Sequence, residues 1–113
     1  MAKVPAYARY LYELNQLKKN AQDPEFEGCE DVLAFLAVKE SEGVIPKITD
    51  LVQSLQFGTG PTVHRKVTVL AERRLIKIAA NKSDARSKDL TLTTAATDLL
   101  KERSRLLKQC VEA

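Results

Sequence analysis

The strongest chemical signal in this sequence is a short basic segment at residues 61–76, which reads PTVHRKVTVLAERRLI. Its apolar residues recur at helical spacing, so one side of the predicted helix should be buried. The segment also carries four cationic side chains and the only histidine of the chain: Arg65, Lys66, Arg73, Arg74 and His64. A helix with this composition can present its outer side to a phosphate backbone, which attracts Lys and Arg whatever the base sequence. The alternative is an ordinary solvated surface.

The phase of this helix predicts which side chains would face a nucleic acid. With Val63, Val67 and Leu70 turned toward the core, one set of side chains lies on the opposite side. That set and its flanks comprise Thr62, His64, Arg65, Lys66, Thr68, Val69, Glu72 and Arg73. The first half of such a face normally meets base edges in a major groove, where Arg65 suits guanine, and Thr62 and Thr68 suit phosphate or a thymine methyl. Val69 fits poorly there, so either it contacts a thymine methyl or the assumed phase is wrong by one position.

A tight turn precedes this helix. Residues 47–55, KITDLVQSL, predict a short helix with an apolar inner side of Ile48, Leu51, Val52 and Leu55. The next residues, QFGTGP, contain two glycines and a proline, which exclude continuous helix. Thr59 or Gly60 would cap the second helix, and the unpaired amides at its start would favour a phosphate. Two short helices joined in this way form a helix-turn-helix.

Alternating apolar residues follow the second helix and predict a β-hairpin. Ile76 and Ile78 lie in its first strand, and Leu90 and Leu92 in its second, on either side of a polar loop at residues 80–88. The loop is basic, with three cations against one acid: Lys82, Arg86 and Lys88 against Asp84. A hairpin directly after a helix-turn-helix is a winged helix.

Further helices are predicted at residues 3–20, 24–41 and 93–113. The first and last carry apolar stripes that one small core cannot easily cover: Val4, Tyr7, Leu11 and Leu14 in the first, and Leu99, Leu106, Leu107 and Cys110 in the last. Pairing with a second copy would bury both stripes, and two-fold dimers match symmetric DNA sites. The alternative is that both helices pack on their own domain.

Composition places the chain among folded proteins of one domain. It has 113 residues, of which 44% are hydrophobic and 29% charged, and no apolar run long enough to cross a bilayer. We expect a cytoplasmic protein, because no export signal is recognisable. Cys29 and Cys110 match no metal spacing and are expected to be reduced and buried, with a disulfide or a redox role as the lesser alternatives.

Charge is distributed unevenly along the chain. Residues 60–88 contain eight Lys or Arg against two Asp or Glu, whereas residues 1–59 contain six against nine. A local excess of this kind attracts polyanions although the whole chain has a net charge of only +3. No nucleophile, histidine and acid are arranged for catalysis, and no glycine-rich phosphate loop is present, so an enzyme, a cofactor and a metal site are not expected.

From Ile48 to Leu100 the chain resembles the MarR-type winged-helix regulators of prokaryotic transcription. The resemblance lies in ITDLVQSLQF, PTVHRKVTVLAERRLI, ATDLL and, above all, the wing sequence SDARSKDLTLT. The resemblance implies a dimer built from terminal helices. It also implies that Arg86 reaches a DNA minor groove while Asp84 braces it. The alternative for Asp84 and Arg86 is a local ion pair that tightens the hairpin, and both can hold. Arg74 stands where the family usually has glycine before LI, so we expect the recognition helix to be stopped differently. Ala96 replaces a second usual glycine, after LT.

The sequence therefore predicts a mainly α fold with a small β-hairpin, a winged helix-turn-helix with extra terminal helices. The single domain 1–113 would comprise a dimerisation helix at 1–22, the winged helix-turn-helix at 24–92 and a second dimerisation helix at 93–113. The predicted function is sequence-specific binding of double-stranded DNA by a homodimeric transcriptional regulator, most simply a repressor, with an unidentified small-molecule effector as an option. The predicted DNA contacts are Thr59, Thr62, His64, Arg65, Lys66, Thr68, Lys82, Arg86 and Lys88. The alternative is a winged helix used only for protein–protein assembly.

Overall fold

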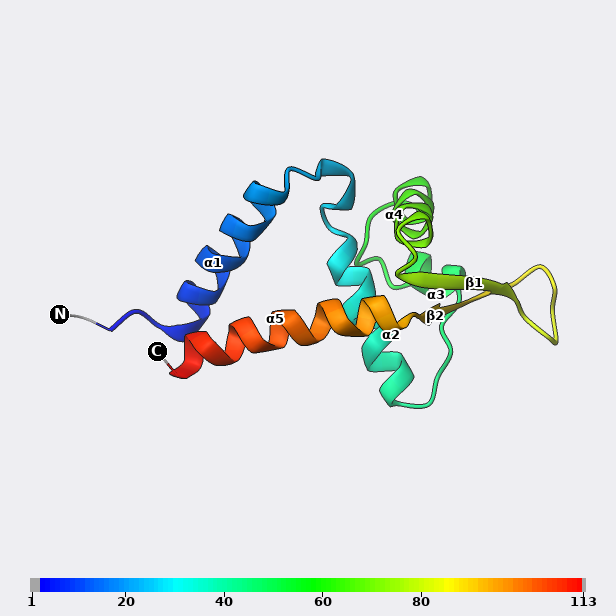
Figure 1. Cartoon of the computed structure of the whole chain (residues 1–113). Helices are drawn as coiled ribbons and strands as arrows, with labels where there is room; N and C mark the ends of the chain where they lie inside the picture. The colour runs from blue at the N-terminus through cyan, green and yellow to red at the C-terminus, as the bar shows by residue number, and fades with distance from the viewer. Residues whose placement is uncertain (1–2, 113) are drawn as a thin grey trace. The chain divides into compact units, whose positions relative to one another are not determined.

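Helices and one hairpin follow each other along the chain in the predicted order (Figure 1). The computed structural model describes residues 3–112. Its elements are α1 (Ala6–Ala21), the 3-10 helix η1 (Pro24–Phe26), α2 (Cys29–Ser41), α3 (Ile48–Gln53), α4 (Gly60–Glu72), β1 (Ile76–Ala80), β2 (Lys88–Leu92) and α5 (Thr94–Glu112). They form two compact units: a central unit of residues 25–97 and a terminal unit of residues 3–24 and 98–112. The predicted fold class, a winged helix-turn-helix with additional terminal helices, is confirmed.

The core of the central unit lies where α2, α3, α4 and the hairpin meet. Its largest fully buried side chains are Leu33, Leu36, Leu51, Leu70 and Leu90, each supplied by one of these elements. The apolar spacing of α2 predicts an inner side of Val32, Leu33, Leu36 and Ala37; the first three are buried, and Ala37 is half-buried. Helical and alternating spacing each turn one side of an element inward, which is why this small unit has a continuous core.

The helix predicted at residues 24–41 is interrupted near its start. Pro24–Phe26 form a single 3-10 turn, and α2 begins only at Cys29. Between them Gly28 has a left-handed backbone, with φ of 80°, which breaks the helical path. Residues 25–28 are consequently a folded turn at the N-terminal end of α2.

Helix α3 is shorter than predicted, and Leu55 is not part of its inner side. The helix ends at Gln53, where the Ser54 hydroxyl donates a hydrogen bond to the Leu51 carbonyl over 2.7 Å. Leu55 then adopts a left-handed backbone and is 85% exposed. The apolar anchor of this turn is Phe57, which is buried and meets the Phe35 ring edge-on at a centroid distance of 5.5 Å.

The hairpin has the register that places its apolar residues opposite one another. Ile76 pairs with Leu92 and Ile78 with Leu90 in the antiparallel ladder. Ile76 and Leu90 are buried, whereas Ile78 is exposed. The segment just before α3 also pairs with β2: the Leu90 amide donates to the Pro46 carbonyl, and Lys47 forms an isolated bridge with Asp89.

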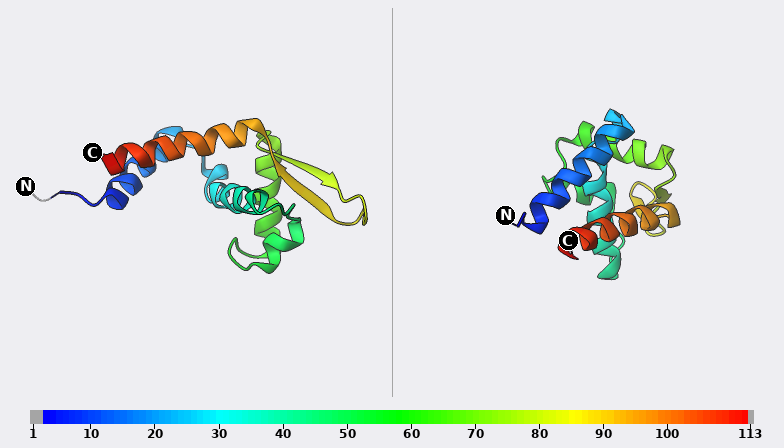
Figure 2. Two further views of the ribbon diagram at one scale, coloured as in Figure 1. Left: turned by 90° about the horizontal axis from the view of Figure 1, so that it is seen from below. Right: turned by 60° about the vertical axis from the view of Figure 1, so that its left-hand side comes forward.

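The terminal unit consists of α1 and most of α5. The N-terminal end of α1 and the C-terminal end of α5 lie close together in every view (Figures 1 and 2). No residue of α1 is buried, and its apolar side chains Tyr7 and Leu11 are exposed. Among the described residues no helix is long and apolar enough to cross a membrane.

Candidate nucleic-acid interface

The start of α4 is fixed by a pair of threonines. Thr59 is the N-cap: its hydroxyl oxygen accepts a hydrogen bond from the Thr62 amide over 3.4 Å, and the two hydroxyls lie 3.1 Å apart. Pro61 occupies the first turn, where a proline lacking its amide hydrogen is well tolerated. Gly58 has φ of 105°, and a Cβ placed there would stand 2.9 Å from Thr62 Cγ2. The turn into α4 therefore requires glycine for both its backbone conformation and its space.

The exposed side of α4 carries most of the polar side chains that the sequence assigns to it. Val63, Val67 and Leu70 are buried, as the phase predicts, and His64, Arg65 and Thr68 are exposed, with Thr62 half-buried. These four side chains belong to the N-terminal and middle turns of the helix, where a recognition helix meets base edges.

Val69 is an exception to the predicted phase. It is 7% exposed, so the expectation that it lies on the outward face is wrong. Helix α4 packs against α2, α3 and β1, so it is covered on more than one side. A helix enclosed by three neighbours needs a wider apolar stripe than one lying on a single surface.

Lys66 lies half-buried beside the turn that precedes α4. Its Nζ donates a hydrogen bond to the Phe57 carbonyl over 3.1 Å. A Cβ built on Gly28 would stand 3.3 Å from the same nitrogen, so the ammonium also lies against the turn before α2. This placement favours an internal role for Lys66 over the predicted contact with DNA.

Helix α4 ends at a residue with a left-handed backbone, so the expectation that it is stopped differently is wrong. Arg74 has φ of 59°, the left-handed geometry in which glycine commonly ends a helix. Its amide bonds to the Ala71 carbonyl, and its own carbonyl accepts a hydrogen bond from the Thr93 hydroxyl over 2.7 Å. The helix is thus stopped in the usual way, with arginine instead of glycine in the strained position.

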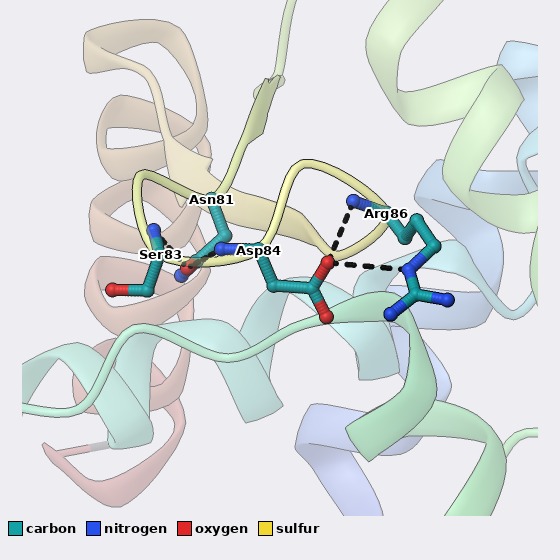
Figure 3. A network of polar contacts seen from close by, with 4 residues as sticks. All are labelled: Asn81, Ser83, Asp84 and Arg86. Carbon is teal, nitrogen blue, oxygen red and sulfur yellow. Dashed lines mark hydrogen bonds and ion pairs between the residues drawn. The ribbon is translucent and has the colours of Figure 1, made fainter.

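The wing loop is held by two acceptor side chains (Figure 3). Asn81 Oδ1 accepts hydrogen bonds from the amides of Ser83 and Asp84, and Asp84 Oδ1 accepts one from the Arg86 amide. Asp84 Oδ1 also lies 3.5 Å from Arg86 Nε. The predicted pairing of Asp84 with Arg86 is present, and the Arg86 side chain is nonetheless 95% exposed.

Sequence reasoning missed Asn81. Its Nδ2 donates to both carboxylate oxygens of Asp89 over 3.0 and 3.3 Å, so it joins the loop to β2 while its Oδ1 organises the loop itself. An asparagine at the start of a polar loop commonly binds the backbone two residues ahead, and that signal could have identified it.

The tip of the wing extends away from α3 and α4 (Figures 1 and 2). Lys82, Arg86 and Lys88 are all exposed on this hairpin. The predicted DNA-contact residues of the helix and the wing therefore belong to one compact unit, residues 25–97. Within residues 3–112 no group of three or more His, Cys, Asp or Glu is placed to hold a metal ion.

The thiol of Cys29 lies directly behind the recognition helix. It is fully buried, and its Sγ donates weak hydrogen bonds to the carbonyls of Glu25 and Lys66 over 3.8 and 4.0 Å. Burial raises the pKa of this thiol, and the positive charges of Arg65 and Lys66 oppose that shift only in part. At neutral pH it is a neutral packing group.

Neither a protein-family model nor the sequence of a curated protein matches this chain. Solved structures do match it. MepR, a transcription regulator of the Staphylococcus aureus multidrug efflux pump MepA, has a TM-score of 0.72 at 19% identity, covering 95% of this chain and 73% of MepR. MepR in complex with DNA has a TM-score of 0.70 at 21% identity, covering 92% and 77%.

A structure of Bordetella bronchiseptica BpsR is also similar. It has a TM-score of 0.67 at 20% identity, covering 95% of this chain and 71% of BpsR. The DNA binding of BpsR is regulated by 6-hydroxynicotinic acid. These similarities establish that the chain has the fold of a MarR-like winged helix.

Proposed function

We propose that this protein is a sequence-specific regulator of transcription that binds double-stranded DNA. The observation that carries the proposal is the braced and fully exposed Arg86 on a hairpin that directly follows a helix-turn-helix exposing Arg65. An arginine held at its base and solvated at its head suits insertion into a narrow minor groove. The crystal structure of MepR with DNA supports the proposal, since the fold is the same.

In this proposal α4 enters a major groove and the wing meets the adjacent minor groove. Arg65 reads a guanine, Thr62 and Thr68 contact phosphate or a thymine methyl, and His64 flanks them. Lys82 and Lys88 contact phosphates beside Arg86. Thr59 acts through its cap, which orders the amides at the helix start, and Lys66 is left out of the contact set because its ammonium binds the Phe57 carbonyl.

The proposal includes a homodimer formed through the terminal helices. Val4, Tyr7, Leu11 and Leu107 are exposed apolar side chains, and Leu14, Leu99 and Leu106 are half-buried. A second copy that covers these side chains would remove them from water, and each fully buried side chain contributes about 1.5–3 kcal/mol. Cys110 is already buried in the single chain, so it adds little to such an interface.

A regulator of this kind would act most simply as a repressor that a small molecule releases from DNA. BpsR, whose DNA binding 6-hydroxynicotinic acid regulates, supports this part of the proposal.

The experiment that tests the function is selection of duplexes from random or genomic DNA, followed by titration of the selected duplex at increasing salt. We expect one enriched motif, with affinity that falls steeply with salt and a preference over scrambled DNA that persists at moderate salt. Weak binding at low salt without sequence preference would favour the alternative, a winged helix used for protein assembly.

A further inference from the structure

The turn at residues 25–28 contacts α4 at two places, one of them at the C-cap residue Arg73. At the C-terminal end of α4, Arg73 Nη2 lies 3.9 Å from Glu25 Oε2, and the Arg73 guanidinium carbon lies 5.4 Å from the centroid of the Phe26 ring. In the middle of α4, the end of the Lys66 side chain lies against Gly28. Lys66 and Arg73 are seven residues apart, about two helical turns, so they mark the same side of α4.

Lys66 also makes a second connection. Its ammonium donates to the carbonyl of Phe57, in the turn that leads into α4, while the end of its side chain lies beside Gly28. The Phe57 ring is buried against Phe35 of α2. One lysine therefore joins three parts of the central unit: the recognition helix, the turn before it and the start of α2.

We propose that Lys66 is a positioning residue, which sets the start of the recognition helix relative to α2 and does not contact DNA. This inference rests on the proposed function. A lysine that binds phosphate needs an ammonium directed to solvent, whereas this one is half-buried and bonded to a backbone carbonyl. Its charge adds to the basic segment in the sequence, but its donor is directed to the protein.

The salt dependence of binding separates the two roles. A lysine that contacts a phosphate releases a counterion, so its loss makes the slope of log K against log salt shallower by about 0.9. A lysine that only positions the helix leaves that slope unchanged and weakens binding equally at every salt concentration.

The test compares Lys66→Met with Lys82→Met, in which the same residue type is changed on the exposed wing. Methionine keeps an unbranched side chain and removes the charge and the donors. Affinity for the selected duplex is measured between 50 and 200 mM salt, at a temperature well below the Tm of each variant. Amide hydrogen exchange is measured on the free proteins across residues 57–60.

For Lys66→Met we expect roughly three- to tenfold weaker binding, the loss of one typical hydrogen bond, with an unchanged salt slope and faster exchange at residues 58–60. For Lys82→Met we expect a shallower slope and unchanged exchange. A slope that becomes shallower in Lys66→Met would overturn the proposal, because it would show a phosphate contact. Unchanged affinity with a lowered Tm would also overturn it, because it would show a role in stability alone.

Failure of the proposed function would be recognised separately. If the unaltered protein selects no duplex, the DNA-binding function is wrong, and the hydrogen-exchange arm still decides whether Lys66 holds the turn. Exchange at residues 58–60 that is the same in Lys66→Met and Lys82→Met would then reject the positioning role.

Discussion

The carboxylate of Asp84 holds Arg86 at two points. The Arg86 backbone amide donates to Asp84 Oδ1 over 3.0 Å, and the Arg86 side-chain Nε lies 3.5 Å from the same oxygen. The contact uses the side of the guanidinium nearest the chain and leaves the terminal nitrogens in solvent. An acid beside a proposed DNA contact would repel phosphate if it acted only as a charge. Its position indicates that bracing of the arginine is its main effect.

Changing Asp84 to alanine distinguishes bracing from repulsion. The change removes a negative charge next to the proposed DNA surface, so simple electrostatics predicts tighter binding. We expect binding roughly three- to tenfold weaker, because Arg86 loses both contacts that order it. Titration of the selected duplex measures the effect, with Glu40→Ala as a control that removes an exposed acid of α2. Tighter binding in Asp84→Ala would reject the bracing role.

Changing Arg65 to alanine should alter sequence preference more than overall affinity for DNA. Arg65 is exposed on α4, and its guanidinium is proposed to recognise one guanine through two hydrogen bonds. We expect discrimination at one base pair to fall by about 1–3 kcal/mol while preference elsewhere in the site is kept. Binding to a set of single-base variants of the site measures this. A uniform loss across all duplexes would instead assign Arg65 to phosphate.

Replacing Arg74 by glycine should stabilise the protein. A left-handed backbone costs a non-glycine residue about 1–2 kcal/mol, and glycine adds an entropic cost of roughly 0.5–1 kcal/mol on folding. The net gain should be about 0.5–1 kcal/mol in the free energy of unfolding, measured by denaturant titration. Arg74→Ala is the matched control, because it removes the same charge and keeps the strain. Equal effects of the two changes would show that charge, not backbone conformation, decides stability there.

The buried thiol of Cys29 should make stability depend on alkaline pH. Its pKa in the folded protein is raised above the ordinary value of 9.0, chiefly by burial, so folding favours the protonated thiol. The contribution is complete below pH 9.0 and is lost as the pH rises through the folded pKa. The free energy of unfolding should therefore fall more steeply above pH 9.0 in the unaltered protein than in Cys29→Ala. Parallel curves for the two proteins would contradict this assignment.

A charge placed on the terminal helices should dissociate the proposed dimer. Leu11 on α1 and Leu107 on α5 are exposed apolar side chains of the terminal unit. In Leu11→Glu or Leu107→Glu, burying an unpaired carboxylate would be unfavourable, so the solution mass measured by light scattering should fall toward 12.6 kDa. Val38→Glu, an exposed apolar position on α2, is the control and should leave the mass unchanged. An unaltered mass in both terminal variants would reject this interface.

The sequence by itself determined the order and type of the elements, apart from the 3-10 turn at Pro24–Phe26 that precedes α2. Apolar spacing predicted α4 and the hairpin, because a helix and a strand each repeat their inner side at a fixed interval that a sequence displays directly. The two glycines and the proline at residues 58–61 located the turn, and the sequence offered Thr59 as one of two possible caps. The Asp84–Arg86 pair was accessible because its two members are near neighbours along the chain.

Only the tertiary structure decided the features that arise where residues far apart in the sequence come into contact. Val69 is buried because three elements enclose α4, and no local pattern states how many neighbours a helix has. Leu55 is exposed because Phe57, paired with Phe35 of α2, is the anchor of the turn. Lys66 looks like one more surface cation in the sequence. Its ammonium is directed inward because the Phe57 carbonyl and the Gly28 backbone, nine and thirty-eight residues earlier, come within reach only after folding.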